Sequence, residues 1–157
     1  MLVGIISDTH GLLRPEAVDA LSHAAMIIHA GDVGEPAVLD RLRELAPVVA
    51  VRGNIDRGSW AARLPETAVV AAAEHNIYVL HDLSRLAVDP RKADLAVVVY
   101  GHSHKPAIET RDGIIYLNPG SAGPRRFRLP ITLARLTLSA ASLHPEIVQL
   151  PITERRQ

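Results

Sequence analysis

The sequence predicts an α/β protein with a parallel sheet in its first third and mostly antiparallel strands in its second half. Over residues 2–54, apolar runs alternate with helical patterns, which favours parallel β-α-β units. Beyond residue 66, short apolar runs are separated by turns. The chain has 157 residues, 48% hydrophobic and 22% charged, so we expect one domain over residues 1–157.

The first third contains three expected strands and two expected helices. "LVGIIS" (2–7) is a continuous apolar run with β-branched residues, typical of a strand buried on both faces. A helix is expected over 14–24, because Pro15 suits a helix start and apolar residues follow at helical spacing. The remaining elements expected here are a strand over 25–32, a helix over 35–45 and a strand over 47–54.

Two hairpins are expected in the second half. Glu74-His75 separates the apolar runs 67–73 and 76–82, and Asp112-Gly113 divides 107–121, since Asp-Gly favours a two-residue hairpin turn. The other expected elements are a short helix or turn at 89–95, a buried strand at 95–101, strands at 131–138 and 142–152, a loop at 122–130 and a frayed tail at 153–157.

Charge and composition exclude several classes of function. Lysine plus arginine and aspartate plus glutamate number 17 each, so bulk electrostatics gives no support for binding a nucleic-acid polymer. Cysteine is absent, which excludes disulfides and thiolate metal sites and fits a reducing compartment. The N-terminus lacks a basic signal region, and no run reaches the about 18 apolar residues that a membrane helix needs. We therefore expect a soluble cytoplasmic protein without a membrane partner.

Polar side chains follow five of the expected strands. They are Asp8, His10, Asp32, Asn54, His81, His102 and His104. In open α/β sheets, ligands bind at the carboxyl ends of the strands. These seven side chains offer oxygen or imidazole nitrogen atoms and no sulfur. Seven ligands are too many for one tetrahedral ion. They suit two divalent ions about 3.5–4 Å apart that share a bridging carboxylate.

Each of these residues also has a structural explanation. His102 and His104 could be ordinary loop residues, and Asp8 could cap a helix. Gly31-Asp32 and Gly53-Asn54 could be turns alone. His29, inside an expected strand, could either support the ligands or be a core histidine. Coincidence at the ends of five strands is hard to accept, so we favour the metal site.

The pattern resembles a known family. Five motif blocks of the calcineurin-like metallophosphoesterases are matched in order by Asp8-x-His10, Gly31-Asp32, Gly53-Asn54-x-Asp56, His81 and Gly101-His102-x-His104. The short chain and the "NPGS" block (118–121) are similar to the small single-domain bacterial phosphodiesterases of that superfamily. The resemblance spans roughly residues 1–125. It implies a four-layer αββα sandwich, with two mixed β-sheets flanked by helices.

The resemblance also implies roles for the residues. One ion would be held by Asp8, His10, Asp32 and His104, and the other by Asp32, Asn54, His81 and His102, with Asp32 as the bridge. Mn²⁺ is the expected metal, with Ni²⁺, Fe²⁺, Co²⁺ and Zn²⁺ as alternatives. The implied reaction is hydrolysis of a small phosphoester, most of all a phosphodiester, by a hydroxide that bridges the two ions. The implied catalytic residues are Asp8, His10, Asp32, Asn54, Asp56 and His102.

Two positions depart from the family pattern. Larger members carry a histidine where Ile55 stands, and that histidine contacts the substrate or protonates the leaving group; small members commonly lack it. Asp56 would then orient the histidine or asparagine ligands. Asp82 stands where relatives usually carry glycine, and it would either crowd or steady the second metal site.

Substrate contacts are expected outside the ligand set. Asn54, Arg125 and Arg126 are the candidate substrate-binding residues, and the "NPGS" block is expected to support the site. Specificity is expected in the loops at 57–60, 83–87 and 123–128.

A competing function is a protein-binding scaffold. The small retromer subunit resembles these enzymes but has a degraded metal set, whereas Asn54 and all four candidate histidine ligands are present here. A nuclease acting on long polymers is disfavoured by the zero net charge. A homo-oligomer would be permitted by an exposed edge of the antiparallel sheet.

Overall fold

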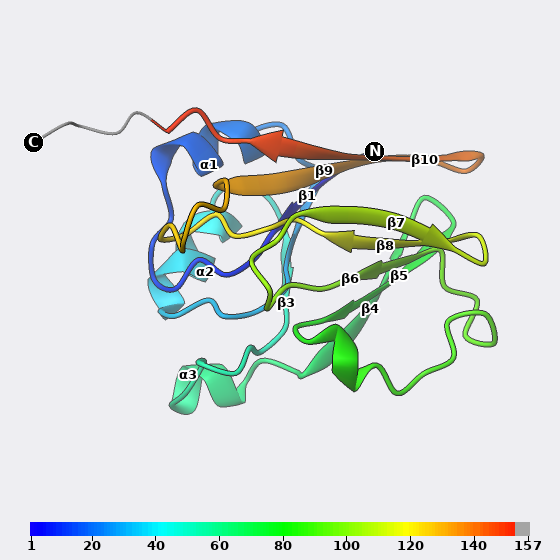
Figure 1. Cartoon of the computed structure of the whole chain (residues 1–157), viewed down its shortest axis with the longest axis horizontal. Helices are drawn as coiled ribbons and strands as arrows, with labels where there is room; N and C mark the ends of the chain where they lie inside the picture. Colours follow the sequence, from blue (N-terminus) through cyan, green and yellow to red (C-terminus); the bar gives the residue numbers. More distant parts are fainter. Residues whose placement is uncertain (153–157) are drawn as a thin grey trace, which may run out of the picture.

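The computed structural model describes residues 1–152 and contains two five-stranded mixed β-sheets (Figure 1). The first sheet consists of β1 (Leu2–Ile6), β2 (Met26–His29), β3 (Val48–Ala50), β9 (Thr132–Ser139) and β10 (Ser142–Gln149), in the order β10-β9-β1-β2-β3. The second consists of β4 (Thr67–Ala72), β5 (His75–Leu80), β6 (Val97–Val99), β7 (Ala107–Arg111) and β8 (Ile114–Asn118), in the order β4-β5-β6-β8-β7. The tail expected to fray, 153–157, lies outside the described residues.

The first sheet has a parallel centre, as the alternating pattern predicts. β1, β2 and β3 pair in parallel and are connected by α1 (Pro15–Leu21) and α2 (Pro36–Arg43). Both helices have a proline in their first turn, where its missing N–H is not needed. The last two strands extend this sheet antiparallel from β1 and do not form a separate unit.

The second sheet combines the two expected hairpins around a parallel centre. β7 and β8 flank Asp112-Gly113 as predicted, while the β4–β5 turn lies at Ala73-Glu74, one residue earlier than expected. β6 pairs in parallel with both β5 and β8. The expected mostly antiparallel pairing therefore holds for the hairpins but not for the middle of this sheet.

Alternating residues of β1 point to opposite faces of the first sheet. Val3 and Ile5 lie in the core between the two sheets, together with Val79 and Val97 of the second sheet. Ile6 faces the other way and packs in the cluster formed with α1 and α2. The two helices thus cover the outer face of the first sheet.

The outer face of the second sheet is covered mainly by irregular chain. Tyr78, Leu80 and Val98 pack against Leu83 and Leu86, which lie in and beside the 3₁₀ turn η1 (Leu83–Arg85). The two mixed sheets are confirmed, but this outer layer has one 3₁₀ turn where a helical layer was expected. A further short helix, α3 (Ser59–Ala62), was not predicted.

The arrangement brings one set of strand ends together. The turns of the β7–β8 and β9–β10 hairpins lie at the opposite end of the molecule from the three α-helices (Figure 1). The carboxyl ends of β1, β2 and β3 lie on the same edge of the first sheet, because these strands are parallel. Within residues 1–152, no helix has the length and hydrophobicity needed to cross a bilayer.

Candidate metal centre

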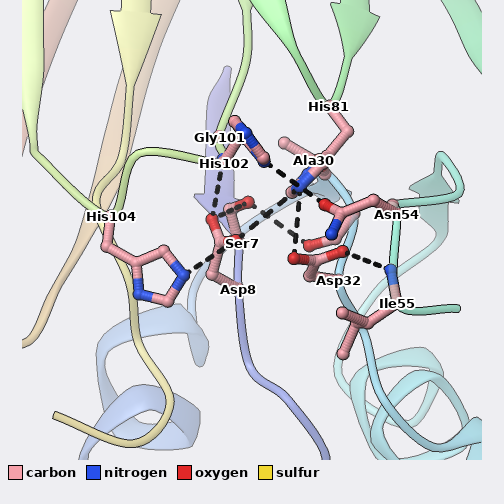
Figure 2. A network of polar contacts seen from close by, with 12 residues as sticks. Ser7, Asp8, Ala30, Asp32, Asn54, Ile55, His81, Gly101, His102 and His104 are labelled. Atoms are coloured by element: carbon pink, nitrogen blue, oxygen red, sulfur yellow. Dashed lines mark hydrogen bonds and ion pairs between the residues drawn. The ribbon is translucent and has the colours of Figure 1, made fainter. Parts of the chain in front are cut away.

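The candidate ligands from both sheets meet in one place (Figure 2). Hydrogen bonds join the sheets there: for example, Nδ1 of His81 lies 2.8 Å from the carbonyl oxygen of Ala30, and the backbone N–H of His102 donates to Oδ2 of Asp8 at 3.2 Å. His81 follows β5 and His102 follows β6, whereas Ala30 and Asp8 follow β2 and β1. The site is therefore built at the junction of the two sheets.

Asp8 lies at the buried centre of this site. Its Oδ1 is 3.3 Å from Nε2 of His104 and 3.9 Å from Nε2 of both His10 and His81. Its other oxygen, Oδ2, accepts a hydrogen bond from the Ser7 hydroxyl at 2.7 Å. One carboxylate oxygen is thus held by the protein, while the other faces three imidazole nitrogens.

Asp32 lies between the two ligand sets implied by the family resemblance. Its Oδ2 is 3.5 Å from Nε2 of His10 and 3.2 Å from Nε2 of His81, one histidine of each set. Its Oδ1 accepts a hydrogen bond from the backbone N–H of Ile55 at 3.1 Å. Asp32 is therefore within reach of a histidine of each set, as is Asp8.

Several polar atoms of the site are buried without a hydrogen-bond partner among the described residues. They are Oδ1 of Asp8, Nε2 of His10, Nε2 of His81 and Nδ1 of His104. The first three face one another, and buried polar atoms normally have partners. Two groups have ligand atoms within 4.8 Å of one another: Asp8, His10 and His104, and Asp8, Asp32 and His81. The arrangement fits divalent cations, which would satisfy the three atoms that face one another.

The two aspartates are ionised. Burial alone would raise the pKa of Asp8, but its interactions with His10, His104, His81 and Ser7 together outweigh burial and hold that pKa well below its ordinary value. Burial also opposes ionisation of Asp32, and contact with His81 lowers its pKa. Burial lowers the pKa of His81, but its contacts with Asp32, Asp8 and the Ala30 carbonyl together raise that pKa above its ordinary value. Two buried negative charges favour cation binding at this position.

Asn54 and His102 form an exposed rim beside the buried ligands. Oδ1 of Asn54 lies 3.2 Å from Nδ1 of His102. Both residues are solvent-exposed, whereas Asp8, Asp32, His81 and His104 are buried. The rim residues are the candidate ligands that a substrate can reach directly.

The backbone is strained at the ligand positions. Five of the candidates adopt left-handed conformations, with φ between 46° and 74°: Asp8, His10, Asp32, His102 and His104. Such values are uncommon outside glycine and cluster at functional sites. Surrounding contacts must therefore hold these loops in place.

Two glycines lack side chains at positions where the candidate ligand residues pack against the backbone. A Cβ atom on Gly53 would collide with the backbone nitrogen and carboxylate of Asp32. A Cβ atom on Gly101 would collide with the side chains of Ser7 and Asp8. The glycine in these two motif blocks is required by close packing between loops, not by backbone conformation.

Asp56 holds the loops that carry the ligands. Its buried carboxylate accepts hydrogen bonds from the backbone N–H groups of Val33 at 3.2 Å, Gly34 at 2.9 Å and Gly53 at 2.8 Å. The sequence suggests that Asp56 orients the histidine or asparagine side chains. Its hydrogen bonds instead go to the backbone next to Asp32 and Asn54, so it positions those residues through their loops.

The "NPGS" block supports the site as expected. The Asn118 amide donates to the carbonyl oxygen of Gly101 at 3.2 Å and to the Ser103 hydroxyl at 3.1 Å. Ser121 donates from its hydroxyl to the carbonyl oxygen of Asp8 at 2.9 Å. These contacts hold the turns after β6 and β1.

His29 and Thr9 link the first two loops beneath the ligands. Nδ1 of His29 accepts from the backbone N–H of Gly31 at 3.1 Å, its Nε2 lies 3.0 Å from the Thr9 hydroxyl, and that hydroxyl donates to the carbonyl oxygen of Val33 at 2.8 Å. Burial lowers the pKa of His29 to about 4, so the ring is neutral. His29 therefore supports the ligand loops. The supporting roles of Thr9 and Ser7 were not predicted; the only sequence signal was a polar residue beside a motif aspartate.

A cavity of about 580 Å³ opens beside the exposed rim. It is lined by Arg52, Gly53, Asn54, Asp56, Arg57, Glu66, Thr67, Leu80, His81, Asp82, Arg85 and His102. The loops expected at 57–60 and 83–87 contribute to it. Arg125 and Arg126, the candidate substrate-binding arginines, lie in an exposed loop and do not line this cavity.

Asp82 holds the turn beside the cavity. Its Oδ1 accepts hydrogen bonds from the backbone N–H of Ser84 at 3.0 Å and from the Ser84 hydroxyl at 2.8 Å. These bonds lower the pKa of Asp82. Asp82 belongs to neither group of candidate metal ligands, so its contacts steady η1 at the edge of the site.

Comparison with known proteins agrees with this geometry. Residues 1–141 match the family model for the calcineurin-like phosphoesterase superfamily domain. A probable metallophosphoesterase of Methanothermobacter thermautotrophicus is 33% identical over 161 residues, which cover 95% of this chain and 92% of that protein.

Solved structures give the same result. YfcE, a phosphoesterase from E. coli, superposes with a TM-score of 0.68 at 26% identity, covering 96% of this chain and all of that one. Vps29 from Entamoeba histolytica in complex with Zn²⁺ superposes with a TM-score of 0.74 at 26% identity, covering 95% of this chain and 99% of that one. On the extent of the family match and the identity to its relative, the chain belongs to the calcineurin-like phosphoesterase superfamily.

Proposed function

We propose that this chain is a single-domain phosphodiesterase that depends on two divalent metal ions. The observation that carries the proposal is the set of buried, unpartnered ligand atoms of Asp8, His10 and His81, with Asp32 between the histidines of the two sets. Mn²⁺ is the metal we expect, because all the donors are oxygen or nitrogen atoms. Two bound cations would act as Lewis acids, activating water and neutralising the phosphoryl oxygens.

The protein residues divide the work by their position. One cation would be held by Asp8, His10 and His104. The other would be held by His81, Asn54 and His102, and Asp32 would bind both cations. Asn54 and His102, on the exposed rim, would also orient the phosphoester that enters from the cavity. Ile55 cannot donate a proton, so the favoured substrates would have leaving groups that depart without protein protonation.

A protein-binding scaffold is the second candidate function. The likeness to Vps29 favours it, since that protein shares the fold over nearly the whole chain. The presence of every candidate ligand favours the enzyme instead, because a scaffold has no need for two ionised, buried carboxylates. The two candidates differ in one measurable property, turnover.

Metal analysis combined with a hydrolysis assay tests the proposal. We expect protein stripped with a chelator and reloaded with Mn²⁺ to hold two ions per chain by mass spectrometry and anomalous scattering. The reloaded protein should hydrolyse bis(p-nitrophenyl) phosphate, and the stripped protein should not. If neither this diester nor p-nitrophenyl phosphate is hydrolysed with Mn²⁺, Ni²⁺, Co²⁺ or Zn²⁺, the scaffold is the better conclusion.

A further inference from the structure

The cavity beside the rim contains three arginines. Arg52, Arg57 and Arg85 line the same space as Asn54 and His102. Its volume of about 580 Å³ falls within the range of small-molecule sites in proteins. Any substrate whose phosphoester reaches the rim residues therefore places the rest of its structure next to these arginines.

The acidic residues of the cavity already have partners. Glu66 forms an ion pair with Arg52, with 2.9 Å between Oε1 and Nη2. Asp56 accepts three backbone hydrogen bonds, and Asp82 is bound by Ser84. These carboxylates thus form structural contacts, and the Asp82 charge acts on Arg85 only through a longer-range electrostatic interaction.

Arg57 and Arg85 are the two cavity cations that remain. Neither guanidinium group forms a hydrogen bond or an ion pair within 4 Å to another residue of the part of the chain described, 1–152. They come from different loops, because Arg57 follows the third motif block and Arg85 ends η1. Both are exposed, so a ligand can reach them without a rearrangement of the core.

We infer that Arg57 and Arg85 bind a second oxyanion of the substrate, distinct from the phosphoester that is hydrolysed. A guanidinium group binds phosphate or carboxylate through two parallel hydrogen bonds, and within residues 1–152 neither Arg57 nor Arg85 has an ion-pair partner within 4 Å. The substrate class is therefore a small phosphoester that carries a further phosphate or carboxylate. This inference rests on the proposed function, and it assigns Arg57 and Arg85 as residues that determine specificity.

Three matched substrates test the inference by kinetics. They are p-nitrophenyl phosphodiesters whose second ester group is propyl, 3-phosphopropyl or 3-carboxypropyl, assayed with the Mn²⁺-loaded protein at constant ionic strength. We expect kcat/KM to be about tenfold or more higher for an anionic tail than for propyl, mainly through a lower KM. The better of the two anionic tails identifies the oxyanion.

The variants R57A and R85A should each reduce this preference about tenfold, and R57K should retain part of it. R91A is the matched control, because Arg91 is exposed and does not line the cavity; its preference should equal that of the unmodified protein. An unchanged preference in both R57A and R85A would overturn the inference, as would the absence of any preference in the unmodified protein.

A binding measurement separates this inference from the proposed function. Propane-1,3-diyl bisphosphate has no diester to hydrolyse, and its affinity for the Mn²⁺-loaded protein can be measured by titration calorimetry against propyl phosphate. We expect the bisphosphate to bind about tenfold more tightly, and R57A and R85A to remove that difference. If none of the diesters is hydrolysed, the proposed function fails, while equal affinities of the two ligands would reject the arginine subsite.

Discussion

The two sides of the candidate metal centre differ in their exposure to solvent. The inner side, Asp8, His10 and His104, lies at the junction of the sheets, and Oδ1 of Asp8 and Nε2 of His10 are buried without a hydrogen-bond partner within residues 1–152. The outer side, Asn54 and His102, is exposed, and its two side chains contact each other. Only the outer side lines the cavity. Under the proposed function, the inner side would retain a cation and the outer side would meet the substrate.

Burial explains why the two sides should respond differently to mutation. An unsatisfied buried polar atom destabilises the folded state by about 1–3 kcal/mol, and a bound cation would satisfy the unpartnered atoms of the inner side. Water can satisfy Asn54 and His102 at the surface. Mutations on the inner side should therefore remove metal, and mutations on the outer side should mainly weaken turnover.

The largest effect is expected at Asp32, which contacts both sets. D32N keeps an oxygen that can accept from the Ile55 N–H, but it removes the charge between His10 and His81. We expect hydrolysis to fall by about 10³-fold or more and metal content to fall below two ions per chain. D40N on α2 is the control, since Asp40 forms an exposed ion pair with Arg43. Full metal content in D32N would contradict a bridging role.

The second prediction compares H104A with H102A. His104 is buried and 3.3 Å from Asp8, whereas His102 is exposed on the rim. We expect H104A to lose one ion on dialysis and H102A to retain more metal, with activity reduced by about 10–100-fold. Mass spectrometry of dialysed samples measures the difference. Equal metal loss in the two variants would show that burial does not distinguish the two sides.

A smaller effect is expected at Asp56, which contacts backbone rather than ligand atoms. D56N replaces one of its two accepting oxygens, although three backbone N–H groups need them. The loops carrying Asp32 and Asn54 should loosen, and we expect metal affinity to fall by about 10-fold, at the lower end of the range for supporting residues. D82N serves as a comparison, because the Asp82 side chain holds only η1. A larger loss of metal affinity in D82N than in D56N would contradict the role of Asp56 in positioning the ligand loops.

The smallest expected effect is the pH dependence from His29 beneath the inner side. Its pKa is lowered to about 4, so below the unfolded value of about 6.5 the unfolded chain binds a proton that the folded chain does not. The free energy of unfolding should therefore decrease by about 2 kcal/mol between pH 7 and pH 5 through this group. Urea titrations should show that H29Q lacks this part of the slope. An unchanged slope would mean that water reaches the inner side.

The elements around the site were predictable where the signals are local. Apolar runs placed β1, β2 and β3, and the Asp-Gly turn placed β7 and β8. The parallel pairing of β6 with β5 and β8 was not predictable, because it depends on contacts between distant segments. The irregular outer layer over the second sheet was also missed, since Leu83 and Leu86 cover it without a helical repeat.

The sequence by itself determined the chemistry of the candidate ligands and their order at the strand ends, because both follow from residue type and local pattern. Only the tertiary structure decided which candidate ligands are buried. It also decided that Asp56 accepts hydrogen bonds from backbone N–H groups and that the cavity lies beside Asn54 and His102. The hydrogen bond from His102 to Asp8 joins residues 94 apart in the chain. The solvent exposure of these side chains and their hydrogen bonds to distant residues arise from the packing of the two sheets, which no local sequence pattern encodes.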